Sequence, residues 1–186
     1  MVKPRFSLLL LLFVGSIMAA YYWSQPSLPA QADYYPVGRD INPFTLTDGD
    51  GEPFTAANLA GHWTFLFIGY TYCPDVCPTA LADLRSIYPD LKKIEPSSQV
   101  VFISADPQRD DSARLKSYTA FFHPEFKAAT GTHRALFPLV RNLGLVYSIV
   151  ESERKAYLID HSASIVLINP EGKLVAMFRP KVAPGD

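Results

Sequence analysis

The feature that most constrains the fold is the apolar run WTFLFIGY, Trp63 to Tyr70, which is followed closely by the only two cysteines of the chain. A near-continuous apolar run of this length favours a central strand that is buried on both faces. Cys73 and Cys77 then lie just past the C-terminal end of that strand, where ligands and chemistry gather in open α/β sheets. The cysteine pair is therefore the first candidate for a functional site.

Strand and helix signals alternate from Arg39 onward. Apolar residues recur at helical spacing from Thr79 to Ile94, and a second buried strand is predicted from Val100 to Ala105. The other predicted elements are short strands at 44–47 and near 53–54, helices at 112–121 and 132–143, and a terminal hairpin of 164–168 and 174–178. This order predicts an α/β sandwich, with a central mixed β-sheet and helices on both faces.

The N-terminus predicts a membrane segment over residues 1–23. Lys3 and Arg5 precede an uncharged stretch, Phe6 to Trp23, which is at the short end of what spans a bilayer. An uncleaved anchor is the favoured interpretation and a cleaved signal peptide the alternative. In either case the positive residues stay in the cytoplasm and the remainder is exported.

The rest of the chain divides into a proline-containing flexible tether, residues 24–38, and one domain, residues 39–186. We expect a single-pass protein of the bacterial inner membrane with its globular domain in the oxidising periplasm. Two cysteines are too few for a disulfide-rich scaffold. The formal net charge is −1, without a basic stripe, so nucleic acid is not an expected partner.

The cysteine spacing favours reactive thiols over a structural disulfide. A disulfide between residues four apart closes a very small loop and restrains the unfolded chain little. If a helix begins at Pro74 or soon after, both sulfurs share one face, and the helix N-terminus favours the thiolate form. A redox couple, a metal-binding pair and two inert thiols all remain open at this point.

A third ligand would separate metal binding from simple redox work. His62, His123 and His133 are interpreted as solvated or capping residues. His161 differs, because it precedes the predicted strand at 164–168, and in sheets of this type that loop faces the cysteine loop. His161 is therefore a candidate functional residue.

Four segments resemble the Sco/SenC family: GYTYCPDVCPTAL, ISADPQRDD, ATGTH and DHSASIVLINPEGKLVAMF. The pairing of C-P-D-V-C-P with a later D-H-S is highly specific. The resemblance implies a membrane-tethered, thioredoxin-like domain in which Cys73, Cys77 and His161 bind one copper ion. It also implies a role in assembling the dinuclear copper site of cytochrome c oxidase subunit II.

Two thiolates and an imidazole form a soft donor set that suits Cu(I) and, with an added ligand, Cu(II). The predicted function is a metallochaperone that delivers copper to subunit II, reduces its cysteines, or does both with the same dithiol. Binding requires reduced thiols, so a periplasmic thiol reductant or copper donor is a further expected partner. Asp75 and Asp160 are candidates for supporting the ligands, with a helix cap and an exposed turn residue as the respective alternatives.

Two departures from the family pattern stand out. Tyr72 precedes the first cysteine, where family members often carry His or Phe. Relatives usually continue into a C-terminal helix where this sequence ends, so we expect part of one sheet face to be uncovered.

Rival functions are a periplasmic thiol–disulfide oxidoreductase, against which the C-x-x-x-C spacing counts, and a copper or redox sensor. A thiol peroxidase is disfavoured because Leu66 and Tyr70 replace its motif residues.

Overall fold

The computed structural model describes residues 4–23, 32–150 and 157–180. The chain divides into two compact units, residues 1–30 and 31–186. The first unit contains helix α1, Pro4–Trp23. Within the described parts of the chain, no helix combines the length and apolar character needed to cross a bilayer. The transmembrane helix expected from the sequence stays a prediction.

The second unit is built around an eight-stranded mixed sheet with the order β1-β10-β9-β4-β5-β6-β2-β3. The central strands β4, β5 and β6 are parallel, and the strands on either side pair antiparallel. The bounds are β1 Ala32–Asp40, β2 Thr45–Asp48, β3 Pro53–Thr55, β4 Thr64–Gly69, β5 Gln99–Ser104, β6 Lys127–Thr130, β9 Ile165–Ile168 and β10 Lys173–Phe178.

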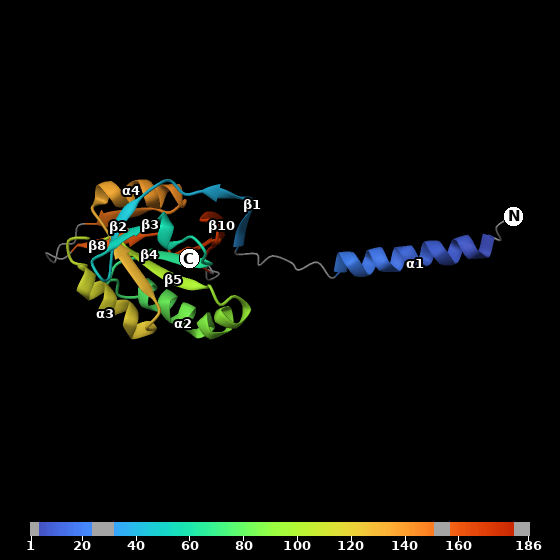
Figure 1. The fold of residues 1–186 in the computed structure, drawn as a ribbon, viewed down its shortest axis with the longest axis horizontal. Helices are drawn as coiled ribbons and strands as arrows, with labels where there is room; N and C mark the ends of the chain where they lie inside the picture. Colours follow the sequence, from blue (N-terminus) through green and yellow to red (C-terminus); the bar gives the residue numbers. More distant parts are fainter. Residues whose placement is uncertain (1–3, 24–31, 151–156, 181–186) are drawn as a thin grey trace. The chain divides into compact units, whose positions relative to one another are not determined.

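Helices cover both faces of this sheet (Figure 1). Helix α2, Val76–Ile94, connects β4 to β5, and α3, Ser112–Phe122, connects β5 to β6. These two helices lie on one face, and α4, His133–Asn142, lies on the other. A short 3-10 helix, η1, spans Ala56–Asn58. The predicted mixed α/β sandwich is confirmed.

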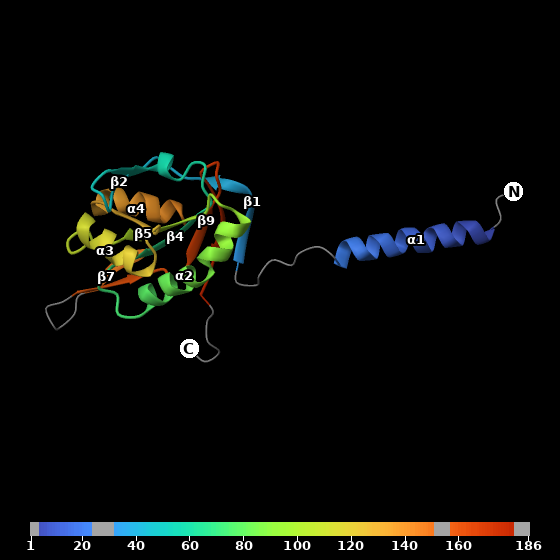
Figure 2. The ribbon, with the colours of Figure 1, turned by 60° about the horizontal axis from the view of Figure 1, so that its bottom comes forward.

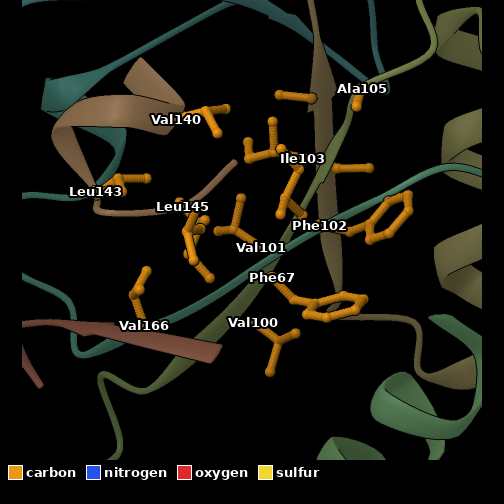
Figure 3. Packing of buried hydrophobic residues seen from close by; sticks show 14 of the residues in the cluster. Phe67, Val100, Val101, Phe102, Ile103, Ala105, Val140, Leu143, Leu145 and Val166 are labelled. Carbon is orange, nitrogen blue, oxygen red and sulfur yellow. The ribbon is translucent and has the colours of Figure 1, made fainter. Parts of the chain in front are cut away.

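The core follows from the alternation of side chains along the buried strands. All six residues of β5 are buried, as expected for a strand covered on both faces. Phe102 contacts the ring of Tyr118 on α3, with 5.5 Å between ring centroids. The neighbouring Val101 faces the other way, and Figure 3 shows it beside Leu145, which follows α4. The two layers of packing hold β4 and β5 firmly, and the cysteine segment leaves from the end of β4.

The predicted tether was too long at its C-terminal end. Residues 24–31 lie outside the described part of the chain, but Ala32–Asp40 form β1, which pairs with β10. Pro36 makes the segment look unlike a strand in the sequence, because proline donates no hydrogen bond to a sheet. It is accommodated because β1 is an edge strand with a register shift between Tyr34 and Arg39.

Two further differences concern the second half of the chain. The sequence predicts only a connection where β6 lies, since the strand consists of small and polar residues, KAAT. A separate two-stranded sheet, formed by β7, Tyr147–Val150, and β8, Leu158–His161, was also not predicted. Figure 2 shows β7 at the rim of the domain. Consequently His161 ends a strand and does not belong to a loop.

The expectation of an uncovered sheet face concerned the C-terminal end of the chain. That prediction falls on residues 181–186, which lie outside the described residues. The described chain follows β10 as far as Pro180.

Candidate metal centre

The first part of the site is the turn between β4 and α2. The sequence predicts this helix from Thr79, but α2 begins at Val76, so Cys77 belongs to its first turn. The backbone amide of Cys77 donates a hydrogen bond to Sγ of Cys73, with 3.4 Å between the atoms. The first amides of a helix have no partner within the helix and stabilise negative charge. The arrangement therefore directs a helix N-terminus at the sulfur of Cys73.

Gly69 explains how the second sulfur reaches the sheet. Cys77 is fully buried, whereas Cys73 is half-buried, and both are free thiols. A Cβ atom at position 69 would lie 2.5 Å from Sγ of Cys77 and 2.8 Å from Cε2 of Phe102. Only glycine leaves room here, because the Cys77 thiol occupies the space that a side chain at position 69 would fill.

His161 brings the third donor atom. Its Nε2 atom lies 3.2 Å from Sγ of Cys77 and 3.8 Å from Sγ of Cys73. The rings of Phe67 and Tyr70 meet the imidazole edge-on, at centroid distances of 5.8 Å and 5.9 Å. The nitrogen and the two sulfurs all lie within 4.8 Å of one another, and no other group of three or more potential ligands occurs among the described residues.

The orientation of the imidazole is set by a backbone carbonyl. Nδ1 of His161 lies 3.2 Å from the carbonyl oxygen of Ser162. Since a carbonyl only accepts, Nδ1 carries the hydrogen, and Nε2 presents its lone pair toward the sulfurs. Asp160 is exposed, and its charge opposes the lowering of the His161 pKa. The hydrogen-bond partner of the imidazole, however, is the carbonyl of Ser162 and not the Asp160 carboxylate.

Desolvation shifts the pKa values of two of the three ligands, His161 and Cys77. Desolvation lowers the pKa of His161, which favours the neutral, metal-binding imidazole. Desolvation also raises the pKa of Cys77, and its hydrogen bond with Cys73 acts in the same direction. The buried thiol therefore keeps its proton in the metal-free protein, and a bound cation would replace that proton.

The remaining predicted residue, Asp75, does not join this group. It is the exposed N-cap residue of α2, and its carboxylate makes no capping hydrogen bond. Its backbone carbonyl instead accepts hydrogen bonds from the amide and the hydroxyl of Thr79. Tyr72 is also exposed, with its ring 4.9 Å from each of two guanidinium carbons, those of Arg109 and Arg114.

The other histidines have partners elsewhere. Nδ1 of His62 lies 2.9 Å from the carbonyl of Ser97, and Nδ1 of His133 lies 2.9 Å from the hydroxyl of Tyr147. His123 accepts a hydrogen bond from the amide of Glu125 through Nδ1. These contacts agree with the sequence-based interpretation that His161 differs from the other three.

Sequence reasoning missed the segment Asp106–Asp110 as part of the site. Asp106 and Asp110 are both buried, and each hydrogen-bonds to a segment adjoining a candidate ligand. The available signal was the presence of two acids at the end of a buried strand, a place where ligands and chemistry gather.

The fold and the site together define a class of protein: a thioredoxin-like α/β domain that brings two free cysteines and one histidine to one point. The SCO1/SenC family model matches residues 35–186. The chain belongs to the SCO1/SenC family.

Individual relatives agree with this placement. The chain is 33% identical over 174 residues to an SCO2-like protein of Rickettsia prowazekii, with 91% of this chain and 85% of that protein covered. It is 37% identical over 140 residues to the mitochondrial SCO1 homolog 1 of Arabidopsis thaliana, which covers 73% of this chain but only 41% of the plant protein. The crystal structure of Arabidopsis thaliana ScoI with copper bound has a TM-score of 0.72 and 34% identity, covering 76% of this chain and 89% of that one.

Proposed function

We propose that this protein is a copper-binding metallochaperone of cytochrome c oxidase assembly, which holds one copper ion between Cys73, Cys77 and His161. The observation that carries the proposal is the convergence of the three donor atoms within 4.8 Å. Membership of the SCO1/SenC family and the likeness to a copper-bound plant relative support it.

The donor set fits copper. Two sulfur ligands and one imidazole are soft donors, and three such ligands satisfy Cu(I) without further coordination. Nε2 of His161 already faces the sulfurs with its lone pair. Cys73 and His161 are half-buried, so a partner can approach two of the three ligands while Cys77 stays enclosed. A site of this kind can both hold and release its cargo.

We further propose that the recipient is the dinuclear copper site of cytochrome c oxidase subunit II. In this view the protein delivers copper to that site, reduces its cysteines before loading, or does both. A thiol reductant in the same compartment keeps Cys73 and Cys77 in the reduced form that metal binding requires, and a copper donor supplies the ion.

The decisive experiment is an anaerobic Cu(I) titration of the reduced full-length chain in competition with a chromophoric Cu(I) chelator. Loss of a residue that merely supports a ligand typically costs roughly 10–100-fold in metal affinity. His161→Ala removes a ligand itself, so we expect one copper per chain in the parent and a loss of at least about 100-fold in the variant.

His62→Ala is the matched control. His62 contacts Ser97 and lies outside the metal group, which is the set formed by Cys73, Cys77 and His161. It should leave both stoichiometry and affinity unchanged. Equal affinity of His161→Ala and the parent would refute copper binding through this histidine.

A dithiol reductase is the second candidate, favoured by the contrast between the two sulfurs. Cys73 is half-buried and receives the helix amide, as an attacking thiolate would require, while Cys77 is buried behind it. Attack by Cys73 on a partner disulfide would release one partner thiol. Attack by Cys77 on the mixed disulfide would then release the second, leaving a Cys73–Cys77 disulfide and a reduced partner. This activity would survive His161→Ala, which separates it from copper binding.

The location also stays a proposal. Lys3 and Arg5 before an uncharged stretch support an inner-membrane protein whose globular domain lies in the periplasm. Protease added to intact spheroplasts should then digest the domain. Protection of the domain until the cells are lysed would contradict this location.

A further inference from the structure

Residues Asp106–Asp110, which follow β5, contact both halves of the metal group. One half is the turn with the two cysteines, and the other is the small β7–β8 sheet that ends in His161. These halves are 84 residues apart along the chain at their closest ligands. The distance between the ligands therefore depends on whatever holds the two segments together.

Asp110 fixes the cysteine half. Its carboxylate accepts hydrogen bonds from the amide of Thr71 at 2.9 Å and from the hydroxyl of Thr71 at 2.5 Å. Ser104, the last residue of β5, donates a third at 2.6 Å. Asp110 is fully buried, so each of these bonds replaces a water contact that the carboxylate has lost. Thr71 lies two residues before Cys73, and the turn is thereby tied to the end of β5.

Asp106 and Arg109 fix the histidine half through Tyr157, the residue immediately before β8. The hydroxyl of Tyr157 donates to the buried carboxylate of Asp106 at 2.5 Å. Arg109 pairs with the same carboxylate through Nε, and its Nη1 donates to the backbone carbonyl of Tyr157 at 3.1 Å. Its guanidinium carbon also lies 3.7 Å from the centroid of the Tyr157 ring.

The β7–β8 sheet needs such an attachment because it has only two strands and is separate from the main sheet. Two-stranded sheets are marginally stable by themselves. A second attachment lies on the other strand, where Tyr147 stacks on Phe137 of α4 and hydrogen-bonds to His133. Tyr147 is paired with His161 across the two strands, so this attachment holds the histidine end of the sheet, and Tyr157 holds the opposite end.

We propose that Asp106, Arg109 and Tyr157 are positioning residues, which hold the β7–β8 sheet so that Nε2 of His161 stays within reach of the two sulfurs. They act through His161 and touch no metal. Asp110 does the same for the cysteine turn through Thr71. The inference rests on the proposed copper function for its consequence, but the attachment itself is a property of the metal-free protein.

Tyr157→Phe tests the proposal, because it keeps the ring against Arg109 and removes only the hydroxyl, which bonds to Asp106 and, at 3.1 Å, to Gln108. We expect Cu(I) affinity to fall about tenfold in the parent background and less than about twofold when His161→Ala is already present. Thr71→Val, which acts on the cysteines, should lower affinity by a similar factor in both backgrounds. Tyr88→Phe is the matched control, since it removes a tyrosine–carboxylate bond to Glu125, away from the metal group, and should not change affinity.

A metal-free measurement separates this proposal from the copper function. In the reduced apo-protein, Tyr157→Phe should increase the hydrogen exchange of the amides of residues 158–161, while Tyr88→Phe should not. If the parent binds no copper but this exchange still increases, the proposed function fails and the attachment stands. Unchanged exchange at residues 158–161, or equal loss of affinity with and without His161, would overturn the proposal.

Discussion

The two halves of the metal group are built differently. The cysteine half belongs to the main body of the domain, where β4 is buried and α2 starts directly behind the turn. The histidine half belongs to a two-stranded sheet with three exposed apolar side chains, those of Ile149, Val150 and Leu158. One half is held by the core throughout. The other joins the core through Ile159 and Tyr147 and is otherwise held by a small number of polar and aromatic contacts.

This difference suggests that the two halves have different roles, one in holding the copper and the other in releasing it. A chaperone must bind its cargo and later give it up, and the weaker attachment is the natural place for release. Opening the β7–β8 sheet would remove one ligand and expose the copper, while the two sulfurs keep their geometry. Local stability within one domain spans a wide range, and elements that move are drawn from the less stable end. On this basis we expect His161 to leave first if the protein releases copper.

The largest effect should come from breaking the rigid half. Gly69→Ala places a methyl group 2.5 Å from Sγ of Cys77 and 2.8 Å from the ring of Phe102, both fully buried. Neither neighbour can withdraw into solvent, so we expect a loss in the free energy of unfolding at the upper end of roughly 1–3 kcal/mol, measured by urea denaturation of the reduced apo-protein. Copper affinity should fall with it, since the sulfur must move.

Gly131→Ala serves as the control for this substitution. Neither glycine has a positive φ angle, so the change in backbone freedom is the same. The methyl group at position 131 would meet a terminal methyl of Leu46 at 2.8 Å, and a side-chain end moves more easily than a thiol held by a helix. A smaller loss of stability and unchanged copper affinity are expected. If Gly131→Ala lowers the stability and the copper affinity as much as Gly69→Ala, the inference that position 69 has a special role beside Cys77 is wrong.

The sequence predicts the rigid half better than the attached half. The apolar run at 63–70 corresponds to β4, and its length and lack of polar residues leave few other structures open. The cysteines follow it directly, so their place in the fold comes with the strand. Position along the chain also indicated His161, although as a loop residue rather than the end of β8. The predictions of the strand and of the place of the cysteines are confirmed because each depends on a local pattern.

The contacts that attach the β7–β8 sheet depend on partners far apart in the sequence. Asp106 and Tyr157 are 51 residues apart, and neither residue alone differs from an ordinary loop residue. The strands of this sheet are short and mostly exposed on one side, which gives a weak pattern. A buried carboxylate needs a partner, but the sequence does not say which one. Such pairings appear only in the folded chain.

The pH dependence of stability tests how firmly the histidine half is held, and the expected effect is smaller than that of Gly69→Ala. Desolvation lowers the pKa of His161, while histidine in an unfolded chain titrates near about 6.5. The folded protein therefore binds fewer protons than the unfolded chain as the pH falls below that value. The stability contributed by the neutral imidazole is present above about pH 6.5 and is lost as the pH falls through the folded pKa. The raised pKa of Cys77 keeps that thiol protonated throughout this range, so the cysteine adds no slope.

The expected result is that the reduced apo-protein loses more stability between pH 7.5 and pH 5 than His161→Gln, in urea denaturation at each pH. One proton limits the difference in slope to about 1.4 kcal/mol per pH unit. Asp160→Asn should enlarge the loss slightly, because that carboxylate favours the charged imidazole, and the increment should shrink in salt since Asp160 is exposed. Identical acid sensitivity of the parent and His161→Gln would mean that the imidazole exchanges freely with water, and the histidine half would then be looser than the contacts of Tyr147 and Tyr157 indicate.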